Sequence, residues 1–256
     1  MLTCGVDIGA RSIEVVLLDE DRVVGEIVTD SGRNPRETAE QVFLGLLADV
    51  GVREGDVART VATGYGRRRF RRADAVFSEI SCHAAGVSHR VPHASTIVDI
   101  GGQDSKAIRL MGPGRVSDFA MNDRCAAGTG KFIEMVAQTL GLSLEASGAL
   151  ALEPGPAIEI SAMCAVFAES EIVGLLHGGA EAGPVLRGVF RSVARRTLSL
   201  LGRLEGDGEI VFTGGVARNP AVVKALERLS GRPVRLPASP QTTGALGAAL
   251  LAGREC

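Results

Sequence analysis

One strand–turn–strand pattern occurs twice in this chain of 256 residues, and this repeat constrains the fold more than any other feature. The segment CGVDIGARSIEVVLL at residues 4–18 aligns with TIVDIGGQDSKAIRL at residues 96–110, at a constant offset of 92 positions. In both segments an apolar run ends in Asp-Ile-Gly and a second run follows at once, so that Asp99 aligns with Asp7. The repeat predicts a molecule built from two duplicated halves.

Apolar runs and helical periodicity predict the other elements. Residues 2–8, 13–18 and 22–29 are short apolar runs with tight turns between them, which predicts an antiparallel meander. Helices are predicted over residues 35–50, from near residue 125, from about residue 164, and over residues 184–204. Residues 209–220 predict a strand, a glycine turn and a helix start, and the final TTGALGAALLAG predicts a closely packed helix.

These elements predict an α/β fold with a cleft shared by its two halves. We expect residues 1–94 together with 243–256 to form the first half, and residues 95–242 to form the second. Lys and Arg total 28 against 30 Asp and Glu, so no basic field favours nucleic acid or an anionic membrane. No apolar run reaches the roughly 18–20 residues of a membrane span, and the N-terminus lacks a secretion signal, which predicts a soluble cytoplasmic protein.

Three glycine turns follow predicted strands and suggest a phosphate-binding protein. They read DIGARS at residues 7–12, DIGGQD at 99–104 and TGGVARN at 213–219. Glycine lets the backbone approach a phosphate closely, and the aspartate can hold Mg²⁺ directly or through water. The alternative is that these are ordinary hairpin turns. The set resembles the phosphate 1, phosphate 2 and adenosine motifs of the actin-like ATPase superfamily, which includes acetate and sugar kinases and heat-shock chaperone ATPases.

The stretch MNDRCAAGTGKFIE at residues 121–134 contains a Gly-Thr-Gly-Lys sequence that superficially suggests a nucleotide P-loop. The pattern needs glycine where Cys125 stands and Ser or Thr where Phe132 stands, so it fails twice. We also expect no strand directly before it. Cys125 is the more informative residue, because both Cys125 and Cys164 precede predicted helix starts, where the helix dipole favours anions such as thiolates. The alternative is that both are small buried hydrophobic residues.

Several motifs in order along the chain resemble the ATP-dependent activators of 2-hydroxyacyl-CoA dehydratases, which are grouped with the ATPase subunits of benzoyl-CoA reductase. They are VATGYGRRRF (61–70), SEISCHAAG (78–86), DIGGQDSK (99–106), FAMNDRCAAGTGKFIE (119–134), SAMCAVFAESEIVGLL (161–176), FTGGVARNP (212–220) and GALGAALLA (244–252). The resemblance covers essentially the whole chain.

The resemblance implies that Cys125 and Cys164 ligate a [4Fe–4S] cluster. A cubane needs about four thiolates, so two chains would share one cluster per homodimer on a twofold axis. The other cysteines would then be non-ligands: Cys4 in a strand, Cys82 packed beside His83, and Cys256 at the chain end. His83 itself is expected to be an interior histidine with satisfied hydrogen bonds. With five cysteines and no Cys-x-x-Cys pair, neither a disulfide framework nor a zinc ribbon is expected.

The resemblance also implies a nucleotide site. Catalytic roles fall on Asp7, Asp99 and Gln103, and Asp7 would hold Mg²⁺. The nucleotide would be contacted by Gly9, Ala10, Arg11, Gly101, Gly102, Gly128, Lys131, Gly214, Gly215, Asn219 and Gln241. The chain departs from the family at Glu14, where the family commonly has lysine, and Arg11 is a hypothetical substitute for that lysine's phosphate contact.

By this resemblance the protein is an ATPase coupled to one-electron transfer. A ferredoxin or flavodoxin would load the cluster, ATP and Mg²⁺ would move the cluster-bearing helices, and an iron–sulfur acyl-CoA dehydratase or reductase would accept the electron. Two alternatives remain at this point: a sugar or acid kinase of the same fold, and a chaperone-like or scaffold ATPase, both without a cluster. The basic run GRRRFRR at residues 66–72 is a solvated face or, alternatively, a docking surface.

Overall fold

The computed structural model describes residues 1–122, 125–161, 164–204 and 208–254. The chain forms two compact units. Unit 1 contains residues 1–97, 108–118 and 237–256, and unit 2 contains residues 98–107 and 119–236. Each unit is described by itself below. The sequence-based division into halves at residues 95 and 242 stays a prediction.

The first sheet has five strands in the order β3-β2-β1-β4-β5. Their bounds are Leu2–Ile8 for β1, Ser12–Asp19 for β2, Arg22–Asp30 for β3, Arg59–Thr63 for β4 and Ala75–Val76 for β5. The strand β2 pairs antiparallel with both β1 and β3, which confirms the predicted meander. The strand β4 pairs in parallel with β1 and places Thr63 opposite Asp7, so these two strands end together.

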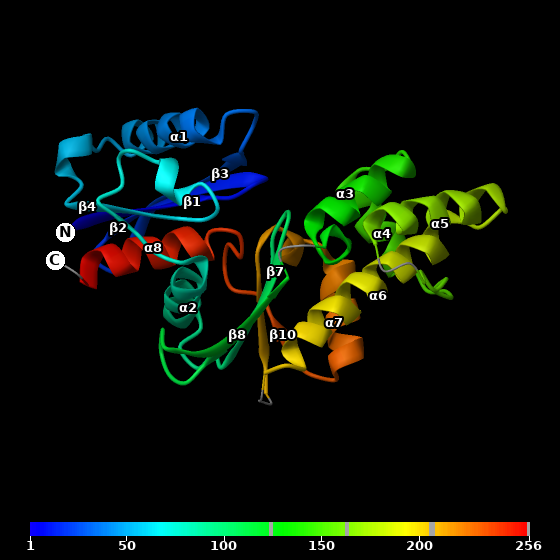
Figure 1. Cartoon of the computed structure of the whole chain (residues 1–256). Helices are drawn as coiled ribbons and strands as arrows, with labels where there is room; N and C mark the ends of the chain where they lie inside the picture. Colours follow the sequence, from blue (N-terminus) through cyan, green and yellow to red (C-terminus); the bar gives the residue numbers. More distant parts are fainter. Residues whose placement is uncertain (123–124, 162–163, 205–207, 255–256) are drawn as a thin grey trace. The chain divides into compact units, whose positions relative to one another are not determined.

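Helices cover both faces of this sheet (Figure 1). On one face, Ile13, Val15 and Leu17 of β2 pack with Phe43 of α1, which spans Pro35–Asp49 as predicted. On the other face, Val16 and Leu18 of β2 pack with α8, which spans Thr243–Arg254. Because successive side chains in a strand point to opposite faces, the uninterrupted apolar run of β2 is explained by burial on both sides.

The helix α8 packs at backbone distance against β1 and against α2, which spans Glu79–Arg90. A Cβ added at Gly5 would lie 1.9 Å from the Ala245 carbonyl oxygen, and one added at Gly86 would lie 2.0 Å from the Thr243 carbonyl oxygen. A Cβ at Gly247 would lie 1.7 Å from the carbonyl oxygen of Cys82. These glycines confirm the predicted close packing of the last helix, and they hold α2, β1 and the start of α8 in one rigid cluster.

The second sheet repeats the arrangement of the first. Its strands are β6 (Thr96–Ile100), β7 (Ser105–Leu110), β8 (Val116–Asn122), β9 (Ile210–Thr213) and β10 (Val234–Arg235), in the order β10-β9-β6-β7-β8. Read from the other edge, this order is that of the first sheet, with β6 in the place of β1 and β9 in the place of β4. The duplication predicted from the sequence is therefore present in the strand order.

Among its described residues, unit 2 contains the helices α3 (Gly130–Thr139), α4 (Leu144–Leu152), α5 (Ala165–His177), α6 (Ala182–Leu201) and α7 (Pro220–Ser230). The predicted helix over residues 184–204 is α6, and its Val189, Phe190 and Val193 are fully buried. They join Phe212 of β9 in one core cluster. Short 3-10 turns complete the chain: η1 (Glu54–Asp56), η2 (Arg67–Arg69), η3 (Ala126–Gly128) and η4 (Gly215–Arg218).

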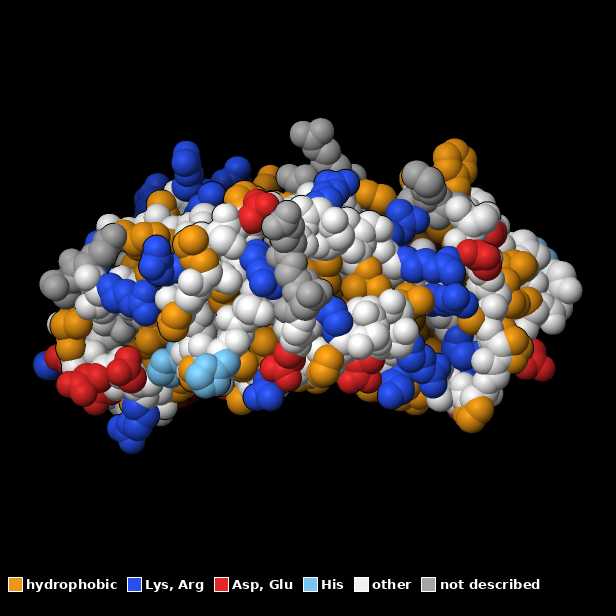
Figure 2. Space-filling view, turned by 90° about the horizontal axis from the view of Figure 1, so that it is seen from below, with side chains coloured by type: hydrophobic (Ala, Val, Ile, Leu, Met, Phe, Trp, Pro, Cys, Tyr) orange, Lys and Arg blue, Asp and Glu red, His pale blue; other side chains and the backbone are white. Residues whose placement is uncertain are grey.

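The surface carries charges of both signs, interspersed with small apolar areas on the face seen in Figure 2. This mixture agrees with the nearly balanced count of acidic and basic residues. Across the residues that the structure describes, no single helix has the length and apolar character of a membrane span, whereas the bent pair α3 and α4 passes on those two criteria alone.

Candidate functional site

The two duplicated hairpins close with the same hydrogen bond. The Gly9 amide donates to the Ser12 carbonyl oxygen at 3.0 Å, and 92 positions later the Gly101 amide donates to the Asp104 carbonyl oxygen at 3.0 Å. In each turn the glycine follows a buried strand whose penultimate residue is aspartate. The sequence repeat is therefore also a repeat of the turn's backbone.

In unit 1 the Asp7 carboxylate lies at the end of β1, enclosed by two glycines from distant parts of the chain. A Cβ added at Gly64 would lie 2.4 Å from Asp7 Oδ1, and one added at Gly244 would lie 2.1 Å from Asp7 Oδ2. Gly64 follows β4 with a φ of +86°, and Gly244 is in the first turn of α8. The first turn of a helix favours a negative charge. Asp7 is directly opposite Glu14 in the β1–β2 register, and both side chains are buried.

In unit 2 the equivalent Asp99 belongs to a buried ion-pair network. Lys106 Nζ lies 3.3 Å from Asp99 Oδ2 and 2.8 Å from Asp104 Oδ1, and the lysine side chain is 2% exposed. Thr213 Oγ1 donates to Asp99 Oδ1 at 3.0 Å. Lys106 occupies the position equivalent to Glu14, so the duplicated site has opposite charges in the two units.

Gly214, in the third glycine turn, allows that turn to approach Asp99 closely. It has a φ of +85°, and an added Cβ would lie 2.4 Å from the Ile100 carbonyl oxygen and 2.8 Å from Asp99 Oδ1. The pair Thr213–Gly214 after β9 corresponds to Thr63–Gly64 after β4. Sequence reasoning missed Gly64 as a site residue, although the shared Thr-Gly after two strands is a signal that could have identified it.

The Gly-Thr-Gly-Lys stretch lies against the second hairpin. The predicted helix start near residue 125 is wrong: Ala126–Gly128 form the 3-10 turn η3, Thr129 is extended, and α3 begins at Gly130. The expected absence of a preceding strand is also wrong, since β8 ends at Asn122. The amides of Gly130 and Lys131 donate to the carbonyl oxygens of Gly101 and Gly102, both at 2.9 Å.

These two hydrogen bonds occupy amides that a P-loop would direct at a phosphate. A P-loop cradles phosphate with backbone amides at its helix start, but here the amides of Gly130 and Lys131 are already bound to the DIGGQD turn. The Lys131 side chain is half exposed and its Nζ is 3.6 Å from Glu134. Unit 2 thus brings together the start of α3, the turn at residues 101–104 and Gly214.

The other predicted nucleotide residues occupy turns and helix starts. Ala10 and Gln103 are at the two hairpin tips and are exposed, as is Gly215. Arg11 forms an ion pair of 3.8 Å with Asp30. Asn219 Oδ1 accepts hydrogen bonds from the amides of Ala221 and Val222 and so caps α7. The remaining two are Gly128, which is buried against Arg196, and Gln241, which is half-buried just before α8.

The two predicted cluster cysteines differ sharply from the other described ones. Cys164 is exposed and is the N-cap of α5, as predicted, and Cys125 is partly exposed at the start of η3. Cys4 in β1 and Cys82 in α2 are fully buried, which confirms their expected packing. Burial raises the pKa of the Cys4 thiol and raises that of Cys82 to about 12, so both stay protonated near neutrality. Cys256 lies outside the described residues.

Side chains hold the chain on either side of the two cysteines. Asn122 accepts a hydrogen bond from the Cys125 amide at 3.3 Å and donates to the Cys125 carbonyl oxygen at 3.1 Å. Glu171 of α5 accepts from the Ser161 amide and hydroxyl, both at 2.9 Å. Val166 and Phe167 immediately after Cys164 are 66% and 70% exposed, which marks an apolar surface beside that thiol.

The basic run at residues 66–72 is partly bound within unit 1. Arg67 donates to the Gly64 carbonyl oxygen at 2.8 Å, and Arg72 pairs with Glu54. Arg68, Arg69 and Arg71 are exposed. These three side chains agree with the solvated face, and no contact in the structure identifies a docking partner for them.

Comparison with known proteins gives consistent matches along the chain. Residues 4–252 match the profile described as the BadF/BadG/BcrA/BcrD ATPase family. An "activator of lactoyl-CoA dehydratase" from Anaerotignum propionicum is 43% identical over 98% of this chain and 97% of the relative. The solved structure of the "activator of the 2-hydroxyisocaproyl-CoA dehydratase" from Clostridium difficile, with bound ADPNP, is 39% identical with a TM-score of 0.94, covering 100% of this chain and 95% of that one.

A more distant structure bears on the fold alone. A ROK-family glucokinase from Streptomyces griseus superposes with a TM-score of 0.61 at 16% identity, covering 99% of this chain and 100% of the kinase. Together with the activator structure, it confirms the predicted α/β actin-like ATPase fold. The low identity carries no information about a sugar substrate.

Proposed function

This chain belongs to the BadF/BadG/BcrA/BcrD ATPase family, and from that membership we propose that it is an ATPase that activates a partner acyl-CoA dehydratase or a related reductase. The similarity to activators of two such dehydratases extends over almost the full length of each chain. These relatives do not determine the partner's substrate, because the dehydratases that they activate act on different acyl-CoA compounds.

The finer proposal concerns the iron–sulfur cluster. We propose that Cys125 and Cys164 supply two of four ligands to a [4Fe–4S] cluster, which supplies one-electron transfer when bound. The donor set fits this role, because both thiols reach the surface while Cys4 and Cys82 are buried. Among the described residues no cluster of three or more His, Cys, Asp or Glu side chains could hold a metal within one chain. The missing ligands would come from a second copy in a homodimer.

The exposed apolar side chains beside Cys164 support that dimer. Val166 and Phe167 would be covered if α5 packed against the same surface of a second chain. Two copies of Cys125 and two of Cys164 would then complete the four thiolates that a cubane requires. The observation that carries the cluster proposal is the exposure of Cys125 and Cys164 beside the burial of Cys4 and Cys82.

ATP and Mg²⁺ are proposed to bind at the glycine turns. Mg²⁺ prefers one or two carboxylates together with phosphate oxygens, and Asp7 provides a carboxylate held by two glycines at a helix start. Asp99 is engaged by Lys106 and Thr213, so its role is to hold the turn at residues 101–104 against Gly214. The start of α3 is hydrogen-bonded to that turn, so a change at the turn would reach η3 and Cys125.

The electron would come from a ferredoxin or flavodoxin and pass to an iron–sulfur enzyme. ATP binding would bias two positions of the elements between the turn and the cysteines. For a one-electron couple, about 59 mV corresponds to about 1.4 kcal/mol, so ATP can supply a useful difference in potential. Gln103, at the exposed tip of the turn, is proposed to act on the water that attacks the γ-phosphate.

The test is anaerobic purification of the wild type and three serine variants. Cys125→Ser and Cys164→Ser should lose bound iron and sulfide, and the dimer should weaken. Cys82→Ser is the matched control, because this thiol is buried in α2 and should leave the iron content unchanged. Iron and sulfide analysis with sedimentation measures both effects. If iron and dimer persist in Cys125→Ser, the ligand assignment fails, and a colourless wild type that phosphorylates a sugar or acid would favour a kinase.

A further inference from the structure

Each of the two proposed cluster cysteines has a polar residue three positions before it, and side-chain hydrogen bonds fix both of these residues. Asn122 precedes Cys125, and Ser161 precedes Cys164. All four residues belong to unit 2. The contacts of Asn122 and Ser161 therefore show how the chain is held where it approaches each thiol.

Asn122 holds Cys125 by both of its backbone polar groups. Asn122 Oδ1 accepts a hydrogen bond from the Cys125 amide at 3.3 Å, and Asn122 Nδ2 donates to the Cys125 carbonyl oxygen at 3.1 Å. The Cys125 backbone is extended, with a φ of −125° and a ψ of 110°. One side chain at the end of β8 thus binds the amide and the carbonyl of the cysteine and restricts both of its backbone dihedral angles.

The chain is also fixed on the other side of Cys125. The Thr129 amide and hydroxyl both donate to the Ala126 carbonyl oxygen, at 3.0 and 2.8 Å. The amides of Gly130 and Lys131 follow directly and are bound to the turn at residues 101–104. Asn122 is thus a restraint before the thiol, and the turn η3 with Thr129 is a restraint after it.

Glu171 has the corresponding place beside Cys164, about two helical turns along α5. Glu171 Oε1 accepts hydrogen bonds from the Ser161 amide and hydroxyl, both at 2.9 Å, and Oε2 lies 3.1 Å from the same amide. Hydrogen bonds to a carboxylate are stronger than those between neutral groups. Cys164 is the N-cap of α5, and its carbonyl oxygen accepts from the Ala168 amide at 2.9 Å. The chain is therefore attached to α5 at Ser161 and again at Cys164.

We propose that Asn122 and Glu171 are positioning residues, which hold Cys125 and Cys164 where their thiols can meet the [4Fe–4S] cluster shared with a second chain. The proposal rests on the proposed function for the cluster itself. A cluster shared by two chains takes its four thiolates from four separate segments, so the conformational freedom of each segment opposes assembly. Loss of a residue that fixes a metal ligand typically costs about 10–100-fold in metal affinity.

The test removes each restraint in two steps. Asn122→Ala removes both contacts to Cys125, whereas Asn122→Asp retains an acceptor for the Cys125 amide and loses the donor to its carbonyl oxygen. Glu171→Ala removes the contacts to Ser161, whereas Glu171→Gln retains one oxygen acceptor. We expect the alanine variants to release iron roughly tenfold faster or more, and the conservative variants to lie between them and the wild type.

Two control variants make the same chemical change at other positions. Glu169→Ala lies on α5 two positions before Glu171, about 200° around the helix, and Asn34→Ala is exposed at the start of α1. Neither should change iron release. Ser161→Ala, alone and combined with Glu171→Ala, gives a double-mutant cycle. If Glu171 acts through Ser161, Ser161→Ala has no further effect once Glu171 is changed.

Iron release is measured on the anaerobically purified full chain, as the rate at which a ferrous chelator removes iron from the dithionite-reduced protein. The reduction potential and the electron paramagnetic resonance spectrum of the cluster that stays bound are recorded for each variant. A displaced ligand changes both signals, whereas a general loss of stability changes neither. Thermal unfolding of the same samples measures that loss separately.

Unchanged iron release in an alanine variant would overturn the role of that residue, and an equal acceleration in the controls would overturn both roles. In either case the proposed function would stay intact. A wild type that carries no iron and sulfide would overturn the proposed function as well. If an alanine variant does not fold, the conservative variant at the same position decides, and the proposal requires faster iron release and an altered spectrum there.

Discussion

The first and second hairpins share a backbone but carry opposite charges at one duplicated position. Each ends a buried strand in Asp-Ile-Gly and closes with the same 3.0 Å glycine hydrogen bond. Across from the aspartate, the second hairpin has Lys106, 3.3 Å from Asp99, and the first has Glu14, directly opposite Asp7. The same fold unit therefore exists in two electrostatic forms within one chain.

The difference explains why the two aspartates are proposed to have different roles. Lys106 pairs with both Asp99 and Asp104 and compensates for one of their two negative charges from within the protein. At Asp7 the duplicated position adds a second carboxylate instead of a cation, and the Asp7 carboxylate packs closely against Gly64 and Gly244. We infer that the first hairpin is the one suited to an external divalent cation.

The largest effect is expected from removal of Lys106, the buried cation of the second hairpin. Lys106→Met leaves the Asp99 and Asp104 carboxylates without their buried partner, and breaking such a pair costs about 3–5 kcal/mol. Denaturant unfolding measures this loss. Lys224→Met is the control, because its side chain is half exposed beside Glu227 and should change stability little. A loss in Lys106→Met no larger than the control's would show that the network contributes little.

The glycines that follow β4 and β9 should behave as an equivalent pair. Gly64→Ala and Gly214→Ala each place a Cβ 2.4 Å from a neighbouring oxygen in a left-handed conformation. Together, backbone strain and overpacking should cost about 3 kcal/mol in each variant. Gly231 also has a positive φ, but the space around it is open. Thermal unfolding of Gly231→Ala should therefore show a loss of stability of only about 1 kcal/mol. If the two variants lose different amounts of stability, the turns after β4 and β9 are not equivalent, and only the hairpins are duplicated.

Conversion of the first hairpin to the charge of the second should alter metal binding. Glu14→Lys places an ammonium opposite Asp7, and this competes with Mg²⁺ for the carboxylate. Because both positions are buried, a charge-assisted contact of about 2 kcal/mol corresponds to about thirtyfold weaker Mg²⁺ affinity, measured by titration with a bound ATP analogue. Glu40→Lys on α1 is the control, since that side chain takes no part in the hairpin. An unchanged Mg²⁺ dependence would contradict the role assigned to Asp7.

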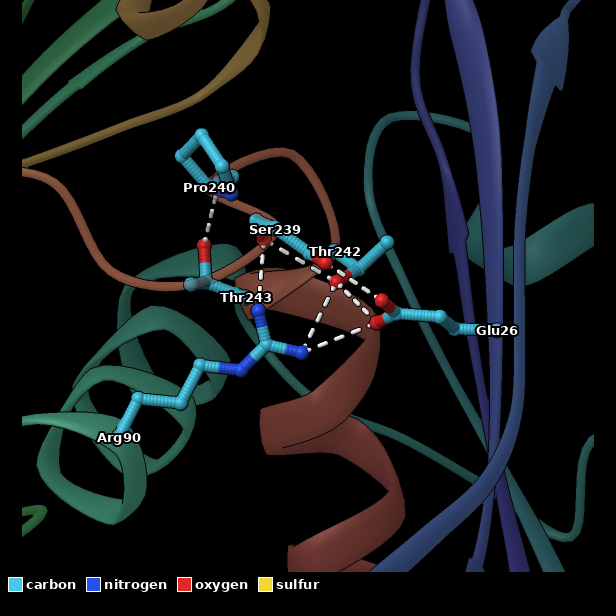
Figure 3. Close-up of polar contacts among 6 residues, drawn as sticks. All are labelled: Glu26, Arg90, Ser239, Pro240, Thr242 and Thr243. Carbon is cyan, nitrogen blue, oxygen red and sulfur yellow. Dashed lines mark hydrogen bonds and ion pairs between the residues drawn. The ribbon is translucent and has the colours of Figure 1, made fainter.

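Glu26 of β3 accepts hydrogen bonds from Ser239 and Thr242, just before α8, and pairs with Arg90 (Figure 3). Loss of these contacts should have the smallest effect on stability, and the effect should depend on pH. Burial raises the pKa of Glu26, but hydrogen bonds from Ser239, Thr242 and Arg90 outweigh it and lower the pKa overall. A carboxylate with a lowered folded pKa stabilises the protein above its unfolded pKa of about 4.5, and this contribution is lost as the pH falls through the folded value.

Glu26→Gln should therefore cost about 1 kcal/mol near neutral pH and reduce the loss of stability below about pH 4.5. Urea unfolding at several pH values measures both. Glu20→Gln, exposed in the turn between β2 and β3, is the reference. If Glu26→Gln and the wild type lose stability equally as the pH falls, the Glu26 contacts do not contribute to stability as predicted.

Much of the fold was predictable because its signals are local. The meander, α1, α6 and α8 follow from short-range patterns of apolar and small residues, and the hairpin duplication follows from a repeated local motif. The start of α3 was not predictable in this way. Its amides are bound to the carbonyl oxygens of Gly101 and Gly102, about 30 positions away, and this contact shifts the helix start to Gly130.

The sequence by itself determined the duplication, the family motifs and the pair Cys125 and Cys164 as candidate ligands, because these are patterns of neighbouring residues. Only the tertiary structure decided that the Asp7 carboxylate lies between Gly64 and Gly244, and that Thr213 and Gly214 approach Asp99. Those contacts join segments far apart in the chain. Glycines after β4 and β9 and in the first turn of α8 allow these close approaches, but the sequence does not show which distant segment each glycine will meet.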